Sequence, residues 1–222
     1  MKTTIEALTK VYESHRDPQA AMAMEAYMRN QYPFLGIKSP QRREILKVFL
    51  NDNPPHKDWI PLLWQLPERE FVNVALDVLF NIRKTLVPQD IAMIEECLVT
   101  KSWWDSVDGL APTVVGYLFD RFPLLQEEYA HKWNQSDNMW LNRSAILFQL
   151  HYKQKTNESL LYSFILNHSA SKEFFIQKAI GWALREYSKT NKDAVIAFIH
   201  NHDLKPLSKR EGLKWLNRIR PE

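Results

Sequence analysis

Glycine is scarce in this sequence, which has only five glycines among 222 residues. That is about 2%, whereas average proteins contain ~7%. The phosphate-binding loops of dinucleotide folds and of P-loop enzymes need glycines clustered at a turn from strand to helix, and no two glycines here lie close enough. The sequence therefore argues against nucleotide-dependent chemistry.

Cysteine and long apolar runs are scarce as well. Cys97 is the single cysteine, which excludes an intrachain disulfide and a thiolate zinc site and suits a reducing compartment. No run approaches the ~20 apolar residues that span a bilayer, and residues 1–10 lack the continuous apolar segment of a secretion signal. We therefore expect a cytoplasmic protein that does not bind membranes.

The charge is nearly balanced: 29 Lys and Arg face 26 Asp and Glu, a formal net charge of +3. Such a weak bias means that any binding of nucleic acid depends on where the basic residues lie. The seven histidines form no HExxH pattern, and no serine stands in a GxSxG turn. We expect neither a metal site nor an α/β-hydrolase nucleophile.

Apolar residues recur at helical spacing along nearly the whole chain, and the alternating patterns of strands are missing. This predicts an all-α fold of about a dozen helices. Proline joints agree, because a proline in the first turn of a helix loses no hydrogen bond. Six joints predict helix starts: Asp17-Pro18, Ser39-Pro40, Leu66-Pro67, Val87-Pro88, Phe122-Pro123 and Lys205-Pro206.

Four aromatic residues indicate a repeated unit. Phe71, Trp104, Trp140 and Phe175 follow one another at intervals of 33, 36 and 35 residues. Such a period is typical of stacked helical pairs, an α-solenoid of HEAT or TPR type. We expect one domain over residues 1–222, whose repeats form a superhelix with a concave wall that binds the ligand.

Residues 101–108, KSWWDSVD, contain the first candidate site. Ser102 and Asp105 predict a capping box at a helix start. Trp104 and Asp108 share another face of that helix. In one interpretation Trp104 packs at the edge of the core beside a solvated Asp108. In the other, the carboxylate of Asp108 is held next to the aromatic ring to stabilise a cation. The predicted buried stripe is Trp103, Val107, Leu110, Val114 and Leu118.

The helix expected over residues 174–189 carries Lys178, Trp182, Arg185 and Lys189 on one face. A basic stripe is commonly just solvated, but an exposed indole among basic residues favours phosphate binding and base stacking. The predicted core stripe of the same helix is Ile176, Ala179, Ile180, Ala183 and Tyr187.

Arg143 lies off the solvent face predicted for its helix and therefore needs an anionic partner. The partner is either an internal carboxylate, Asp108 included, or a phosphate. The solvent face itself is predicted to consist of Asn138, Asn142, Gln149 and Lys153.

A third basic group follows Gly36. The helix start at Ser39, with its free backbone amides, joins Lys38 and Arg43 in a possible phosphate site. Taken alone, this pattern also fits a solvated helix end.

Three segments, Lys101–Asp108, Ala145–Leu150 and Ser171–Trp182, resemble the AlkD family of bacterial DNA alkylation-repair glycosylases. The resemblance extends from Met24 through Arg210. It implies a HEAT-like repeat enzyme that removes positively charged 3-methyl and 7-methyl purines from duplex DNA, without a metal or cofactor.

The resemblance also implies roles for single residues. The family's catalytic carboxylate matches Asp108, and its two lesion-flanking tryptophans match Trp104 and Trp182. One position departs from the pattern, because His151 stands where the family can carry a lysine, which concerns one phosphate contact. The remaining DNA contacts of the family match Arg143, Arg185 and Tyr27.

A purine alkylated at N3 or N7 leaves as a neutral base and needs little general-acid help. The residues then have to stabilise an oxocarbenium-like sugar and place a water, both of which one carboxylate can do. We expect Asp108 to do this in a monomer, with activity on cationic lesions and almost none on uracil.

Two other functions compete with this one. A non-catalytic HEAT-like module could grip bent or branched DNA with the same basic wall, although it would gain nothing from an acid beside a phosphate track. A protein–protein scaffold is the commonest task of α-solenoids, but it does not explain basic stripes interrupted by tryptophan.

Overall fold

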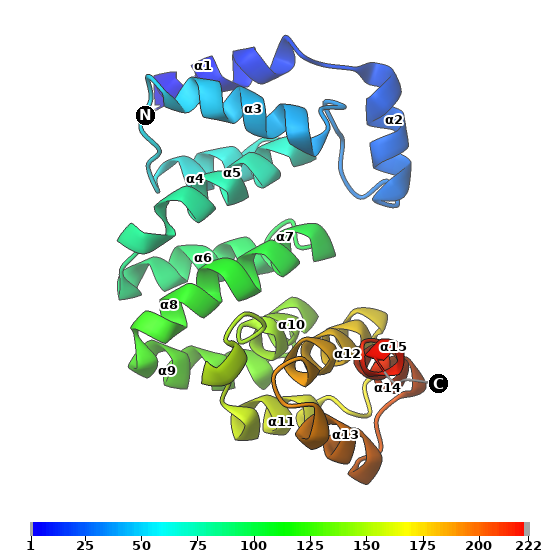
Figure 1. Cartoon of the computed structure of the whole chain (residues 1–222). Coiled ribbons are helices and arrows are strands. Elements are labelled where there is room, and N and C mark those ends of the chain that lie inside the picture. Colours follow the sequence, from blue (N-terminus) through cyan, green and yellow to red (C-terminus); the bar gives the residue numbers. More distant parts are fainter. Residues whose placement is uncertain (1, 220–222) are drawn as a thin grey trace. The chain divides into compact units, whose positions relative to one another are not determined.

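The computed structural model describes residues 2–219, and every regular element in this range is a helix (Figure 1). The prediction of an all-α fold is confirmed. None of these helices combines the length and apolar character that crossing a bilayer requires. The chain forms two compact units, Met1–Leu86 and Val87–Glu222, and the prediction of a single domain over residues 1–222 stays a prediction.

The first unit contains five α-helices and one 3-10 turn. The helix α1 packs against α3 and α4, and α5 also packs against both. Most side chains of α5 are buried, so this helix forms the centre of the unit. The elements are α1 (Lys2–Glu13), α2 (Pro18–Tyr27), α3 (Ser39–Leu50), α4 (Trp59–Gln65), α5 (Arg69–Ile82) and η1 (Arg83–Thr85).

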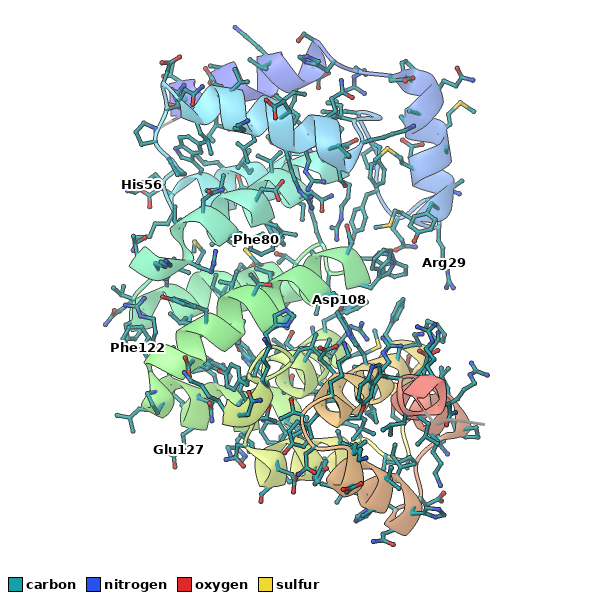
Figure 2. The ribbon with its side chains drawn as sticks, viewed as in Figure 1. Arg29, His56, Phe80, Asp108, Phe122 and Glu127 are labelled. Atoms are coloured by element: carbon teal, nitrogen blue, oxygen red, sulfur yellow. The ribbon has the colours of Figure 1, made fainter. Side chains whose placement is uncertain are left out.

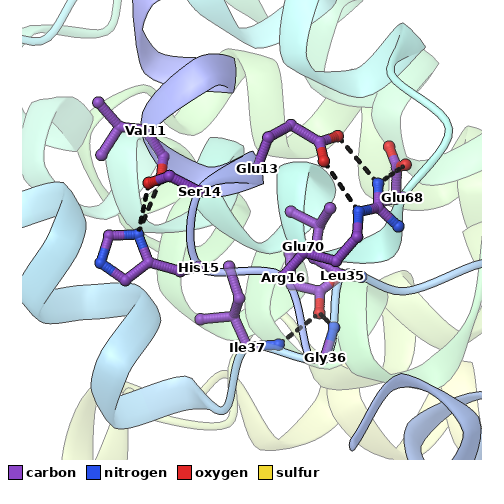
Figure 3. A network of polar contacts seen from close by, with 10 residues as sticks. All are labelled: Val11, Glu13, Ser14, His15, Arg16, Leu35, Gly36, Ile37, Glu68 and Glu70. Atoms are coloured by element: carbon purple, nitrogen blue, oxygen red, sulfur yellow. Dashed lines mark hydrogen bonds and ion pairs between the residues drawn. The ribbon is translucent and has the colours of Figure 1, made fainter. Parts of the chain in front are cut away.

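A buried acid on α5 determines the path of the loop between α2 and α3. The carboxylate of Glu70 accepts hydrogen bonds from the backbone N–H groups of residues 35–37 at 2.9–3.0 Å, two of which are drawn in Figure 3. Gly36 has φ +92°, and a Cβ there would lie 2.1 Å from the carbonyl oxygen of Asp17. Only glycine suits this position, and the loop it forms leads directly into Lys38 and α3.

In the second unit α10 packs against α6, α7, α9 and α12, and α12 in turn lies beside α14 (Figure 1). Apolar residues of α10, α11, α12 and α13 share one core. The elements are η2 (Pro88–Asp90), α6 (Ile91–Val99), α7 (Trp104–Leu110), η3 (Ala111–Val115), α8 (Gly116–Arg121), α9 (Pro123–Asn134), α10 (Met139–Leu147), η4 (Lys153–Lys155), α11 (Glu158–Asn167), α12 (Phe174–Ser188), α13 (Lys192–Asn201), α14 (Pro206–Leu213) and α15 (Leu216–Ile219).

Five of the six proline joints begin a helix or 3-10 turn as predicted. At the sixth joint, Leu66 has the extended backbone that a following proline imposes, and α5 begins only at Arg69. The four aromatic residues of the predicted repeat all lie in the first turn of a helix, namely of α5, α7, α10 and α12. The spacing therefore corresponds to the starts of these four helices.

Candidate functional site

The segment before α7 differs from its prediction. The hydroxyl of Ser102 donates to the carbonyl of Leu98 at 2.6 Å, near the end of α6. The helix begins at Trp104, and Trp103 before it is extended and makes no side-chain cap. The predicted capping box of Ser102 and Asp105 is therefore wrong, because the N-cap position falls one residue later, on Trp103.

The central contact of the site joins Asp108 on α7 (Figure 2) to Arg143 on α10. Arg143 donates from Nε to Oδ1 of Asp108 at 2.7 Å and from Nη2 to Oδ2 at 2.8 Å, and its Nη1 donates to the carbonyl of Phe175 on α12. The side chain of Arg143 is 4% exposed and that of Asp108 21%. Of the two partners left open for Arg143, the structure supplies the internal carboxylate.

Arg143 is so deeply placed because α10 is buried on all its faces. Residues 141–150 are all buried, so the predicted solvent face of this helix is wrong at Asn142 and Gln149. Asn142 donates from Nδ2 to the carbonyl oxygens of Trp133 and Ser136 at 2.9 and 2.8 Å. Amide side chains that satisfy backbone carbonyls can lie in a core, which polarity alone does not reveal.

Burial raises the pKa of the Asp108 carboxyl, and the hydrogen bonds and charge of Arg143 offset only part of that shift. The charge of Asp105 raises the pKa further. Arg143 takes one lone pair on each carboxylate oxygen, and a carboxylate offers about four. Asp108 thus has an exposed edge that can accept from water or face a cation.

A π-helical turn, η3, begins at Ala111, three residues after Asp108. Pro112 has no N–H to donate to the carbonyl of Asp108 four residues earlier, and its ring would crowd that oxygen. The backbone widens over Ala111–Val115 instead, with the N–H of Gly116 bonded to the carbonyl of Ala111. The sequence predicts one continuous helix here and misses this turn, although π-turns are frequent at functional sites.

The buried stripe of this segment is confirmed at its four later positions. Val107, Leu110, Val114 and Leu118 are fully buried. Trp103 is half-buried and packs against the rings of Trp140 and Phe175, with centroids 5.9 and 5.2 Å away.

The two tryptophans of the predicted site lie on α7 and α12. Trp104 is half-buried and is placed one turn before Asp108 on the same helix face. Trp182 is half-buried against the core, and within residues 2–219 its indole N–H meets no acceptor. It stands two turns, about 10 Å, along α12 from Phe175, whose carbonyl Arg143 binds.

The basic face of α12 exists, but it is paired. Lys178 and Arg185 both bind Glu211 of α14, at 3.1 and 3.0 Å, and Lys189 binds Glu186 at 2.6 Å. Sequence reasoning missed Glu211, because an acid 26 residues or more from its partners gives no local signal. The predicted core stripe of α12 is confirmed, with Tyr187 half-buried and the others buried.

The remaining predicted residues are at the surface. His151 is exposed just beyond α10. Tyr27 is exposed at the end of α2, and Lys38, Ser39 and Arg43 are exposed at the start of α3. Lys38 precedes that helix without a side-chain cap, as a free helix start requires.

The neighbouring arginine of α3 has another task. Arg42 is buried and donates to Asp77 of α5 at 3.0 Å, whereas the Nε of Arg43 lies 3.8 Å from the same carboxylate.

Within residues 2–219, no three His, Cys, Asp or Glu side chains are placed to hold a metal ion.

Comparison with known proteins agrees with the geometry. A family model described as DNA alkylation repair enzyme matches residues 8–216. A solved structure described as a predicted DNA alkylation repair enzyme from Enterococcus faecalis is 34% identical, with a TM-score of 0.84 over 91% of this chain and 97% of that one. No curated relative matches the chain. The chain belongs to the family of DNA alkylation repair enzymes.

Proposed function

We propose that this protein is a DNA glycosylase that hydrolyses the N-glycosidic bond of 3-methyl and 7-methyl purines in duplex DNA. The family supports alkylation repair in general. The observation that supports the glycosylase is Asp108, a buried carboxylate held by a bidentate guanidinium and open at one edge.

The chemistry needs one anion rather than an acid–base pair. A purine methylated at N3 or N7 already carries positive charge, so it takes the electron pair of the breaking glycosidic bond and leaves as a neutral base. The deoxyribose becomes oxocarbenium-like, and the exposed edge of Asp108 stabilises that charge and orients the attacking water. Arg143 lowers the pKa of the carboxyl against the effect of burial and fixes its orientation.

The tryptophans and basic residues complete the proposal. Trp104 and Trp182 present ring faces to the cationic sugar, an attraction of about 1–2 kcal/mol each when water is excluded. The backbone phosphates are bound by exposed or half-exposed residues, which position the lesion without reading sequence. These are Tyr27, Lys38, Ser39, Arg43, His151, Lys178, Arg185 and Lys189.

Arg143 also stands among the proposed phosphate contacts, and salt dependence tests this part. Its two remaining N–H bonds are free for an anion, since Asp108 and Phe175 take three of five. A flatter salt slope for Arg143→Ala, by about one contact, supports the phosphate contact, and an unchanged slope leaves Asp108 as its only anion.

The decisive experiment measures release of methylated base from alkylated duplex DNA by the wild type and by Asp108→Asn. We expect the variant to lose excision by roughly 10²-fold or more while it keeps its affinity for DNA. Asp105→Asn on the same helix is the matched control and retains excision. Equal excision rates for wild type and Asp108→Asn would defeat the assignment of Asp108, whereas no base release by the wild type would favour the non-catalytic DNA-binding module.

A second substrate tests the selectivity. Because the scheme has no general acid for a neutral leaving group, we expect almost no release of uracil from uracil-containing duplex DNA. Efficient uracil release by the purified protein would contradict the mechanism.

A further inference from the structure

One buried acid outside the Asp108 site gathers three cations. Glu211 on α14 has a side chain only 10% exposed. Lys178 lies 3.1 Å from its Oε1, and Arg185 and Lys214 lie 3.0 and 3.9 Å from its Oε2. The cluster therefore carries a net charge of +2 around a carboxylate that is itself shielded from water.

The packing of α14 on α12 builds this cluster. A Cβ at Gly181 would lie 2.4 Å from the Cβ of Glu211 and 3.0 Å from the carbonyl oxygen of Ser208. The hydroxyl of Ser208 donates to the carbonyl of Gln177 at 3.1 Å. The missing side chain at Gly181 thus lets α14 approach until Glu211 reaches the cations of α12.

Lys178 and Arg185 are placed on the same face of α12 as Trp182, four residues before and three residues after it. Their side chains are 37% and 27% exposed. Each uses one donor nitrogen on Glu211, so Arg185 and Lys178 keep N–H groups for a second acceptor. The structure therefore holds two cations beside one indole, with donors left over.

We propose that Glu211 is a positioning residue, which holds Lys178 and Arg185 beside Trp182 so that their remaining donors bind DNA phosphates. The inference rests on the proposed function, since it assigns these cations to DNA. Long basic side chains lose rotamer freedom when they bind. The ion pairs with Glu211 restrict the side chains of Lys178 and Arg185 before DNA binds, so less rotamer freedom is lost on binding.

The pKa of Glu211 is consistent with this role. Burial by itself raises the pKa, but the hydrogen bond from Lys178 and the charges of Lys178, Lys214 and Arg185 lower it to a net value below the usual range. The carboxylate is thus ionised throughout the neutral range, and its hold on the two cations persists there.

The test is Glu211→Gln in the full chain, with duplex DNA carrying 7-methylguanine as the ligand. The variant gains one unit of positive charge, so simple electrostatics predicts tighter binding. Positioning predicts the opposite, and we expect Kd to rise about 5-fold to 20-fold. The single-turnover excision rate at saturating DNA should change by less than about 2-fold, because Asp108 is untouched.

Glu186→Gln is the matched control. Glu186 lies on α12, the helix that carries Lys178 and Arg185, and pairs with Lys189 at 2.6 Å. Its replacement makes the same change in net charge as Glu211→Gln. We expect Glu186→Gln to bind DNA as tightly as the wild type or more tightly. If Glu211→Gln behaves like Glu186→Gln, the positioning role is overturned.

Three further variants separate the outcomes. Glu211→Asp keeps the charge but withdraws the carboxylate by one methylene, so a smaller rise in Kd in the same direction is expected even if Glu211→Gln unfolds. Lys178→Gln and Arg185→Gln test the proposed contacts themselves. If these two leave Kd and the salt slope unchanged, the DNA contacts assigned to α12 fail and Glu211 has nothing to position; if they weaken binding and both Glu211 variants do not, only the positioning role fails.

Discussion

Asp108 and Glu211 are both largely buried carboxylates that join two helices, yet their environments shift the pKa in opposite directions. Asp108 meets one guanidinium, and burial outweighs that partner, so its pKa is raised. Glu211 meets three cations, which together outweigh burial, so its pKa is lowered. Burial and the number of positive partners together therefore set the direction of each pKa shift.

This difference bears on function. An anion that is incompletely compensated still gains from a further positive charge, such as a developing oxocarbenium ion. An anion surrounded by three cations has little left to offer a substrate and instead organises its partners. The comparison therefore distinguishes the proposed catalytic carboxylate from the proposed positioning one within the same unit of the chain.

The largest expected effect on stability concerns Arg143. Arg143→Ala leaves the largely shielded carboxylate of Asp108 without this guanidinium, and we expect the free energy of unfolding to fall by roughly 3–5 kcal/mol. Urea unfolding measures it. Lys214→Ala removes one of the three cations near Glu211, and the side chain of Lys214 is half exposed. We expect this change to lower the free energy of unfolding by less than ~1 kcal/mol. Similar losses for both variants would mean that the number of partners does not matter.

Gly181→Ala tests the packing that builds the Glu211 cluster. The added methyl group meets Glu211 and the backbone of Ser208, so we expect the free energy of unfolding to fall by roughly 1–3 kcal/mol. Gly212→Ala is the control, because its nearest neighbours are side-chain atoms of Ile199 and Leu184 at 3.1 and 3.3 Å. It should cost less in the same thermal or urea unfolding experiment.

The two carboxylates should give opposite pH dependence of stability. A raised folded pKa means that ionised Asp108 costs stability, so the wild type gains relative to Asp108→Asn as pH falls through that pKa. A lowered folded pKa means that Glu211 contributes stability above the unfolded value of ~4.3, which is lost as pH falls. Unfolding of each variant and the wild type between about pH 3 and 7 measures both slopes, and slopes of the same sign would refute the comparison.

The smallest expected effect belongs to Lys189, which pairs only with Glu186 on its own helix. If it binds a single phosphate, Lys189→Gln lowers the salt slope of DNA binding by about one contact and leaves stability nearly unchanged. Fluorescence anisotropy with duplex DNA at several salt concentrations measures the slope. If Lys189→Gln raises the Kd for DNA as much as Arg185→Gln does, positioning by Glu211 adds nothing to binding.

Local sequence patterns predicted much of the fold. The helical spacing of Val107, Leu110 and Leu118 places them in the core, where the structure has them. Prolines predicted five helix starts, because the effect of a proline on the first turn is local. Ser102 was misjudged as the N-cap, since the N-cap position falls on Trp103 and only the structure shows where α7 begins.

The sequence by itself determined that the chain is helical, where most helices begin and which residue types line the candidate site, because these properties depend on neighbours within about one or two turns. Only the tertiary structure decided what those residues meet. Arg143 finds Asp108 35 residues away, and Glu211 reaches Arg185 across 26 residues. The sign of each carboxyl pKa shift follows from those distant partners, which no local pattern encodes.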